Sequence, residues 1–473
     1  MMPDDDQGQN IFPVDNQSGG GDPNQGIFPT SEQNRAGGDP NQAQQVSAGG
    51  DQGSSVGQGL AAGGGQPASD DNDQSAAPQT PAAPTRRFGN PLAAVGHFVA
   101  NMLHGEHPNL AFQPLPKPTG PAPYHLSLDD VLNADHHAEQ LATIRASERL
   151  VFHTVGDTGA IQSPLILQGV VGAMTADYEA SDATARPAFF YHLGDVVYYT
   201  GQGVDYYNQF YDPYDHYPLP IFAIPGNHDG DVDAGGDAVP SLNAFVTNFC
   251  SPTYEITKDA GDTHRDAMTQ PNVYWTLETP LATFIGLYTN VPEGGRLDAD
   301  QIAWFQSELA SAPIDKALLV AMHHPIFSVD QFHAGSQYMK QVLEQAIEKT
   351  SRVPDAIFSG HVHNYQRFTC NLSGRDVPFI VAGAGGYFSL HRMQKASDGG
   401  TLQVPHEFPE LAVTLENYCA DHHGFVRVEV TSQTLKGMYY AVPAPHASGP
   451  ARLVDSFTLD LKTHQLIPAA SGA

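Results

Sequence analysis

The chain has 473 residues, which leaves room for more than one domain and for a large buried core. Acidic residues outnumber basic ones by 52 to 22, and the formal net charge of -30 argues against nucleic acid or an anionic membrane as the main partner. No apolar run approaches the length of about 18 residues that a membrane span needs. Three scattered cysteines are too few for a disulfide framework, although one disulfide stays open.

Residues 1–85 consist mostly of Gly, Gln, Asn, Asp, Ser, Ala and Pro, with almost no apolar clusters. Such a composition cannot repay the entropy of folding, so we expect a disordered, low-complexity tail. The unit Ile-Phe-Pro occurs at residues 11–13 and again at 27–29. A spacer is the favoured role, and a protein partner that binds these units is the alternative. Residues 1–10 lack a secretory signal, so a cytoplasmic location is the default expectation, with non-classical export left open.

Residues 86–147 are expected to pack as an extension on the domain that follows. Asn90 and Pro91 are typical of a helix start, and Gly105 of a helix end. The apolar residues between them share one face, which favours packing on the rest of the chain over docking on a membrane or a partner. A Pro-rich stretch at 110–124 should run extended over the surface, and a helical pattern covers 128–146.

Residues 148–470 alternate between strand-like and helical patterns. Five apolar runs are typical of buried strands, at residues 151–155, 188–193, 219–224, 317–322 and 356–359. Helical patterns precede or follow them at 166–178, 301–310 and 337–349. This alternation predicts an α/β fold with a mostly parallel or mixed sheet. Three further strands, at 424–430, 435–442 and 454–461, would complete a second sheet and give a β-sandwich wrapped in helices.

Each of the five apolar runs ends at side chains that bind metals. Open α/β sheets bind ligands at the carboxyl ends of their strands, so we expect a single sheet edge to gather these side chains. Carboxylate and imidazole without thiolate suit iron, zinc or manganese. Seven ligands exceed the need of one ion, which predicts two ions with a bridging carboxylate. The seven are Asp157, Asp195, Tyr198, Asn227, His323, His361 and His363.

Together these stretches resemble the five ordered motifs of the calcineurin-like metallophosphoesterases, and the resemblance covers about residues 150–381. The motifs are Gly156-Asp157-x-Gly159, Gly194-Asp195-x-x-Tyr198, Gly226-Asn227-His228-Asp229, Val320-x-x-His323 and Gly360-His361-x-His363. The form with Tyr198 is similar to that of the purple acid phosphatases, including the tartrate-resistant acid phosphatases.

The resemblance implies two metal ions and assigns their ligands. Ferric iron would be held by Asp157, Asp195, Tyr198 and His363. A divalent iron, zinc or manganese ion would be held by Asn227, His323, His361 and the bridging Asp195. A phenol ionises at neutral pH only under a strongly acidic cation, so Tyr198 favours a trivalent ion. The alternative is Tyr198 as a core aromatic with two divalent ions.

The activity implied is that of a phosphoric ester hydrolase on a four-layer α/β/β/α sandwich of two mixed sheets flanked by helices. A metal-bound hydroxide would attack small phosphate esters, most of all phosphomonoesters, as in an acid phosphatase. One alternative is a phosphodiesterase or nucleotide pyrophosphatase that uses the same site. The other is a non-catalytic protein that binds a phosphorylated ligand and acts through its N-terminal tail.

Five residues are expected to act on the substrate. His228 matches the histidine that contacts the phosphate or protonates the leaving group, and Asp229 is predicted to orient it. Asn227, His324 and His333 are predicted substrate contacts; plain surface histidine is the alternative for His333.

Two further features receive structural interpretations. Arg367 is predicted to pair with a carboxylate rather than to clamp the substrate. The Gly-rich stretch 383–386 lacks the Lys of a phosphate-binding loop, which favours a tight turn near the site.

Overall fold

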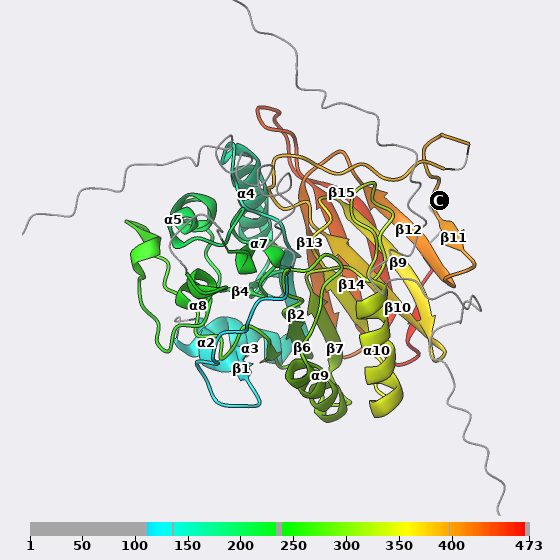
Figure 1. Ribbon diagram of the computed structural model, residues 1–473, viewed down its shortest axis with the longest axis horizontal. Helices are drawn as coiled ribbons and strands as arrows, with labels where there is room; N and C mark the ends of the chain where they lie inside the picture. Colours follow the sequence, from blue (N-terminus) through cyan, green and yellow to red (C-terminus); the bar gives the residue numbers. More distant parts are fainter. Residues whose placement is uncertain (1–110, 135–136, 233–238, 397, 469–473) are drawn as a thin grey trace, which may run out of the picture. The chain divides into compact units, whose positions relative to one another are not determined.

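The structure is a computed structural model that describes residues 111–134, 137–232, 239–396 and 398–468 (Figure 1). The tail predicted for residues 1–85 and the helix predicted from Asn90 lie outside these ranges. Residues 111–124 carry neither helix nor strand, as expected for a Pro-rich stretch.

Two sheets dominate the described part of the chain. Its nine-stranded sheet has the order β1-β5-β6-β7-β8-β10-β9-β12-β11, and its seven-stranded sheet has the order β16-β15-β14-β13-β2-β3-β4. The bounds in the first sheet are β1 His125–Ser127, β5 Trp275–Glu278, β6 Ala282–Leu287, β7 Ala317–Met322, β8 Ala356–Ser359, β10 Arg375–Ala382, β9 Tyr365–Leu372, β12 Val413–Cys419 and β11 His406–Phe408. Those in the second are β16 Gln465–Leu466, β15 Arg452–Asp460, β14 Thr434–Ala441, β13 Gly424–Thr431, β2 Arg149–Val155, β3 Phe190–His192 and β4 Ile221–Ala223.

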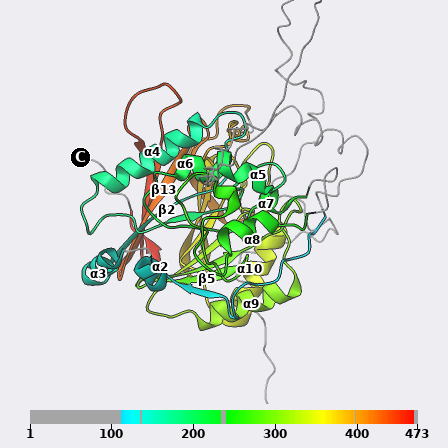
Figure 2. The same ribbon diagram turned by 90° about the vertical axis from the view of Figure 1, so that its left-hand side faces the viewer.

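Helices cover the outer faces of the two sheets, and short helices lie within the connections between strands. The α-helices of the described residues are α2 Leu128–Ala134, α3 Ala138–Ser147, α4 Leu165–Ala180, α5 Gly203–Tyr206, α6 Asp212–Tyr214, α7 Asn227–Gly230, α8 Asn243–Phe249, α9 Ala299–Ser311 and α10 Gln337–Thr350. A π-helical turn spans Tyr207–Tyr211 and a 3₁₀ turn spans Lys258–Ala260. Figure 2 shows α4 and α9 on opposite sides of the strands.

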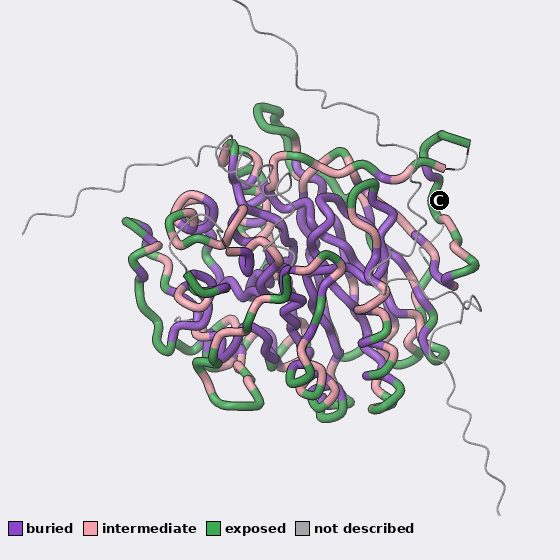
Figure 3. The backbone as a smooth tube through the Cα atoms, viewed as in Figure 1, coloured by how far each residue is buried: buried purple, intermediate pink, exposed green. Residues whose placement is uncertain are grey.

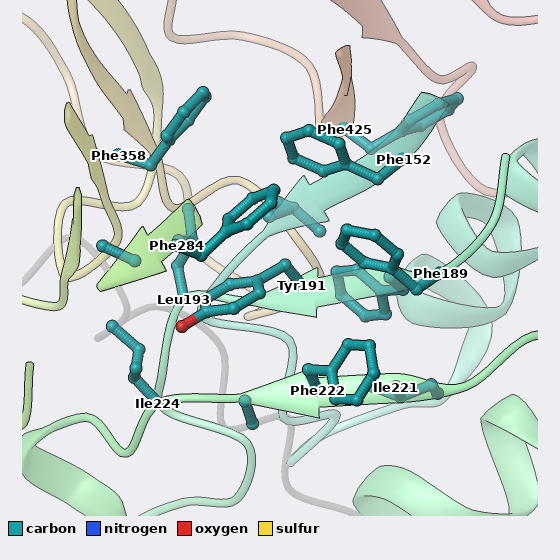
Figure 4. Packing of buried hydrophobic residues seen from close by; sticks show 14 of the residues in the cluster. Phe152, Phe189, Tyr191, Leu193, Ile221, Phe222, Ile224, Phe284, Phe358 and Phe425 are labelled. Atoms are coloured by element: carbon teal, nitrogen blue, oxygen red, sulfur yellow. The ribbon is translucent and has the colours of Figure 1, made fainter. Parts of the chain in front are cut away.

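Aromatic side chains fill the space between the sheets (Figure 4). The ring of Phe152 on β2 meets Phe284 on β6 edge-on at 4.9 Å between centroids, and Tyr191 on β3 stacks on Phe284 at 5.4 Å. Aromatic pairs of this kind add about 0.5–1.5 kcal/mol beyond the burial of their area. The buried residues therefore concentrate along the central strands, as Figure 3 shows.

The outer face of each sheet packs on helices. Phe305 of α9 and Met339 of α10 belong to one buried cluster with Val320 of β7. On the other sheet, His153 follows Phe152 and so points away from the interior, where its Nε2 lies 2.9 Å from Asp177 of α4. The prediction of two mixed sheets flanked by helices in four layers is confirmed.

The strands and helices expected from the apolar patterns are confirmed as β2, β3, β4, β7, β8, α4, α9, α10 and β13 to β15, while the pattern at 128–146 forms α2 and α3. The expectation of a single sheet edge is wrong. Strands β2, β3 and β4 run parallel in the seven-stranded sheet, whereas β7 and β8 belong to the nine-stranded sheet. An apolar run does not encode its pairing partner, so the sequence did not separate the two groups.

Two expectations from composition concern cysteines and membranes. Cys250, Cys370 and Cys419 are all buried, and none forms a disulfide in the structure, which closes the alternative of one bridge. Within the described ranges, every helix falls short of the length and apolarity that a bilayer crossing requires.

Candidate metal centre

The loops that follow β2, β3, β4, β7 and β8 meet at one end of the sandwich. Ligand atoms of Asp157, Asp195 and His323 all lie within 4.8 Å of one another. His363 Nε2 lies 3.5 Å from Asp157 Oδ1, and His323 Nε2 lies 3.1 Å from Asn227 Oδ1. The structure thus brings together side chains from both sheets that the sequence spreads over more than 200 positions.

In one half of this cluster, formed by Asn227, His323 and His361, hydrogen-bond acceptor atoms face one another. His323 Nδ1 donates to the Leu193 carbonyl at 2.8 Å, so in the neutral ring Nε2 carries the lone pair. That lone pair faces Asn227 Oδ1 and Asp195 Oδ2, which is 3.4 Å away. His361 Nδ1 also faces Asn227 Oδ1, at 2.9 Å. Oxygen and nitrogen lone pairs that converge without a donor between them form a donor set that fits a cation.

The other half combines a carboxylate, a phenol and an imidazole. The Tyr198 hydroxyl lies 3.2 Å from Asp157 Oδ1 and 3.3 Å from His363 Nε2. Gln209 holds the Tyr198 backbone from both sides, because its amide accepts from Tyr198 N and donates to Tyr198 O, each at 2.9 Å. The Tyr198 ring is 2% exposed, so the phenol reaches this cluster from inside the protein.

Three of the predicted ligands have a left-handed backbone. The φ angles are 59° for Asp157, 54° for Asp195 and 68° for His361. Such conformations cost about 1–3 kcal/mol each in residues other than glycine and concentrate at functional sites. Gly194, with φ of 95°, precedes Asp195, and a Cβ atom there would lie only 2.6 Å from His323 Nδ1. The turns therefore need glycine to bring the ligands this close.

Burial and charge shift the ionisation of the cluster. Burial opposes the charge of His323, but the Asp195 carboxylate beside it raises the pKa of His323 to about 9. A proton on this ring occupies the position that a bound cation would take. Burial, and then the charges of Asp157 and Asp195, hold the pKa of Tyr198 well above its usual value of 10. Without a strongly charged cation, Tyr198 is therefore a neutral phenol.

His228 and Asp229 lie in the short helix α7, which begins at Asn227 after β4. His228 Nδ1 lies 2.9 Å from the Tyr199 carbonyl, and its backbone N–H donates to Asp195 Oδ1 at 2.9 Å. The prediction that Asp229 orients His228 is wrong. The Asp229 carboxylate folds back over the start of α7 and accepts from backbone N–H groups of Val196 (3.1 Å), Val197 (3.2 Å) and Gly226 (2.8 Å). Asp229 thus joins the second and third loops.

His324 and His333, the predicted substrate contacts, both lie beside His361. His324 Nδ1 lies 2.7 Å from Thr289 Oγ1, and its buried Nε2 has no partner in the structure's described part. The His324 ring lies 4.3 Å from that of His361, and the His333 ring 4.4 Å from it.

Several residues of the cluster were not identified from the sequence. The rings of Tyr387 and His391 lie 4.2 and 4.3 Å from that of His363. Glu293 lies 3.0 Å from His333 Nδ1. Tyr387 and His391 follow the glycine stretch after β10, and Glu293 follows β6. At β6 the sequence shows an apolar run followed by polar residues, which could have indicated the loop of Glu293. That loop carries no recognisable motif, so Glu293 was not identified.

The structural interpretations of Arg367 and residues 383–386 are confirmed. Arg367 forms two hydrogen bonds to Asp455, at 2.7 and 3.0 Å, and does not face the cluster of ligands. Gly385 N donates to Gly156 O at 3.1 Å, and a Cβ atom at Gly385 would lie 2.3 Å from that oxygen. The glycines therefore let this turn pack directly against the first loop.

Residues 155–365 match the family model described as Calcineurin-like phosphoesterase. This segment of the chain is therefore similar to the calcineurin-like phosphoesterases. The matched segment includes all seven predicted ligands, from Asp157 to His363.

In sequence, the chain is similar to two purple acid phosphatases of Arabidopsis thaliana. Purple acid phosphatase 21 is 28% identical over 174 residues, which are 35% of this chain and 36% of the relative. Purple acid phosphatase 15 is 24% identical over 213 residues, 43% of this chain and 36% of the relative. The matches thus span about a third of the length of these relatives. The structure is also similar to purple acid phosphatase PPD1 from yellow lupin (Lupinus luteus) seeds, with a TM-score of 0.47 and 17% identity over 69% of this chain and 57% of that chain.

Proposed function

We propose that the chain is a metal-dependent hydrolase of phosphate esters, with monoesters as preferred substrates. The observation that carries this proposal is the convergence of acceptor atoms from five loops of two sheets, centred on Asp195 and Asn227. Acceptors that are buried together are stabilised by cations, and paired cations suit phosphoryl transfer. The match to purple acid phosphatases supports the same chemistry.

The two halves of the cluster would hold two ions. Asp157, Tyr198 and His363 would bind a ferric ion, and Asn227, His323 and His361 a divalent iron, zinc or manganese ion. Asp195 would bridge them. The bound ions would supply a hydroxide nucleophile at neutral pH and offset charge on the phosphate oxygens. Three anionic side chains do not neutralise a trivalent and a divalent ion, so the site keeps a positive charge for a phosphate dianion.

The chain's own residues would orient the ester and move the proton. The Tyr199 carbonyl fixes the proton of neutral His228 on Nδ1, so Nε2 would take up a second proton before it donates to the phosphate or to the leaving oxygen. Asp229 would support catalysis by bonding to the backbone N–H groups of Val196 and Gly226, the chain neighbours of Asp195 and Asn227. Asn227, His324 and His333 would contact the substrate, since they surround His361.

Turnover of a monoester and a diester tests the function and its rivals. We expect p-nitrophenyl phosphate to be hydrolysed with a higher kcat/KM than bis(p-nitrophenyl) phosphate, because a dianion is attracted more strongly to a positive site. Faster hydrolysis of the diester would favour the phosphodiesterase or nucleotide pyrophosphatase. Binding of inorganic phosphate without turnover of either ester would favour the non-catalytic protein.

Tyr198 provides a spectroscopic test of the ferric ion. Protein loaded with iron should absorb visible light through charge transfer from the Tyr198 phenolate, and Tyr198→Phe should lose this band while it stays folded. Tyr199→Phe is the matched control, because Tyr199 bonds to Tyr387 and not to the ligands. An active, colourless protein that contains only zinc or manganese would rule out the ferric ion.

A further inference from the structure

The loop between β6 and α9, residues 288–298, contacts three histidines of the candidate metal centre. Its Thr289 bonds to His324. Its Glu293 lies 3.0 Å from His333 Nδ1 and 3.4 Å from His361 Nε2. This loop contains none of the five motifs, although it lies beside the residues proposed to bind the divalent ion and the substrate.

The contact between Glu293 and His361 favours one tautomer of the ring. Both carboxylate oxygens of Glu293 lie 3.4 Å from His361 Nε2, and a carboxylate can only accept hydrogen bonds. A hydrogen bond to Glu293 therefore requires the proton of neutral His361 on Nε2, in competition with Asn227 Oδ1, an acceptor 2.9 Å from Nδ1. The lone pair is then on Nδ1, which faces Asn227 Oδ1 at 2.9 Å. The opposite tautomer would place a proton where the donor set needs a lone pair.

The loop holds Glu293 through contacts that do not involve its carboxylate. Ser336, the N-cap residue of α10, donates its hydroxyl proton to the Gly294 carbonyl. Arg296 N donates to Thr289 O at 2.7 Å and closes the loop. The Glu293 side chain itself is 52% exposed, so its replacement should leave the fold intact.

We propose that Glu293 is a positioning residue that fixes the Nε2–H tautomer of His361 and the ring orientation of His333. The carboxylate would orient a metal-binding histidine from its far side, as carboxylates commonly do in metal sites. Loss of such a partner typically weakens metal binding about 10–100-fold. The consequence for turnover rests on the proposed function, whereas the tautomer and the metal affinity can be measured without it.

The experiment compares Glu293→Ala, Glu293→Gln and the control Glu410→Gln, whose side chain is exposed in a turn. Nitrogen NMR of protein with labelled histidine, without metal, reports the tautomer of each ring. Competition with a zinc chelator reports the affinity for the divalent ion. We expect Glu293→Ala to lose the fixed tautomer of His361 and to bind zinc about 10–100-fold more weakly. Glu293→Gln keeps an acceptor oxygen and should restore most of both properties.

Two outcomes would overturn the inference. Either Glu293→Ala keeps the tautomer and a zinc affinity within twofold of the control, or Glu293→Gln is as impaired as Glu293→Ala. If the parent protein hydrolyses no phosphate ester but Glu293→Ala changes the tautomer and the affinity as expected, the proposed hydrolase fails and the positioning role stands. Equal melting temperatures of the variants and the control would show that the effect is local.

Discussion

Asp195→Ala is expected to lower kcat/KM for p-nitrophenyl phosphate by at least about 10³-fold and to remove bound metal at the same time. The carboxylate faces both halves of the cluster, since one of its oxygens lies within 4.8 Å of ligand atoms of both Asp157 and His323. Its loss would leave two ions without the ligand that they share. Hydrolysis rates and metal content of the same preparation provide the measurement.

Asp300→Ala is the matched control for this variant, because Asp300 is exposed in the first turn of α9. It should keep both the activity and the metal. Retained hydrolysis by Asp195→Ala after its metal is lost would contradict the role assigned to Asp195.

Arg367→Met is expected to lower the free energy of unfolding by about 3–5 kcal/mol, the usual cost of breaking a buried ion pair. Arg367 on β9 and Asp455 on β15 belong to different sheets, and their side chains are only 9% and 5% exposed. The variant leaves the Asp455 carboxylate buried beside Tyr365 and Asn417 without its charged partner. Urea unfolding would measure the loss.

The exposed pair of Arg145 and Asp129 supplies the control, and Arg145→Met should cost no more than about 1 kcal/mol. The double variant Arg367→Met with Asp455→Leu should recover part of the loss, because no unpaired charge remains. A cost below 1 kcal/mol for Arg367→Met would show that the two sheets do not depend on this pair.

The pair of Arg367 and Asp455 also has a defined pH dependence. Burial alone would raise the pKa of Asp455, but the hydrogen bonds and charge of Arg367 outweigh it and hold the pKa below the usual 3.8. The stabilisation by the ionised carboxylate is therefore complete above about pH 4 and is lost as the pH falls through the lower folded value. Without Arg367, burial raises the pKa of Asp455 in the folded variant, so the difference in stability between the parent protein and Arg367→Met should be largest near neutral pH and shrink as the pH falls.

The strands that a continuous run of apolar residues indicates were predicted well. The apolar runs that became β7 and β8 were assigned with their observed bounds, and each ends at a side chain of the cluster. The assignment worked because buried strands need continuous apolar residues and because the turns after them need glycine. Glycines such as Gly194 and Gly360 stand where a Cβ atom would approach His323 or Asp157 within 2.6 Å.

The features that depend on contacts between distant segments were not predicted. The sequence does not tell that β2 pairs with β13 while β7 pairs with β6, so the division of the site between two sheets was missed. The predicted partner of Asp229 was wrong for the same reason. Its observed partners depend on the pairing of β3 with β4, which brings the loops after the two strands together. Glu293 reaches His361 only because β6 and β8 flank β7 in one sheet.

The central claim is that seven side chains from two sheets hold a pair of metal ions. Anomalous X-ray scattering from crystals of the protein loaded with iron and zinc tests it most directly. The account predicts two peaks about 3.5–4 Å apart, one against Asp157, Tyr198 and His363, the other against Asn227, His323 and His361, with Asp195 between them. Crystals of loaded protein that show no peak among these side chains would contradict it.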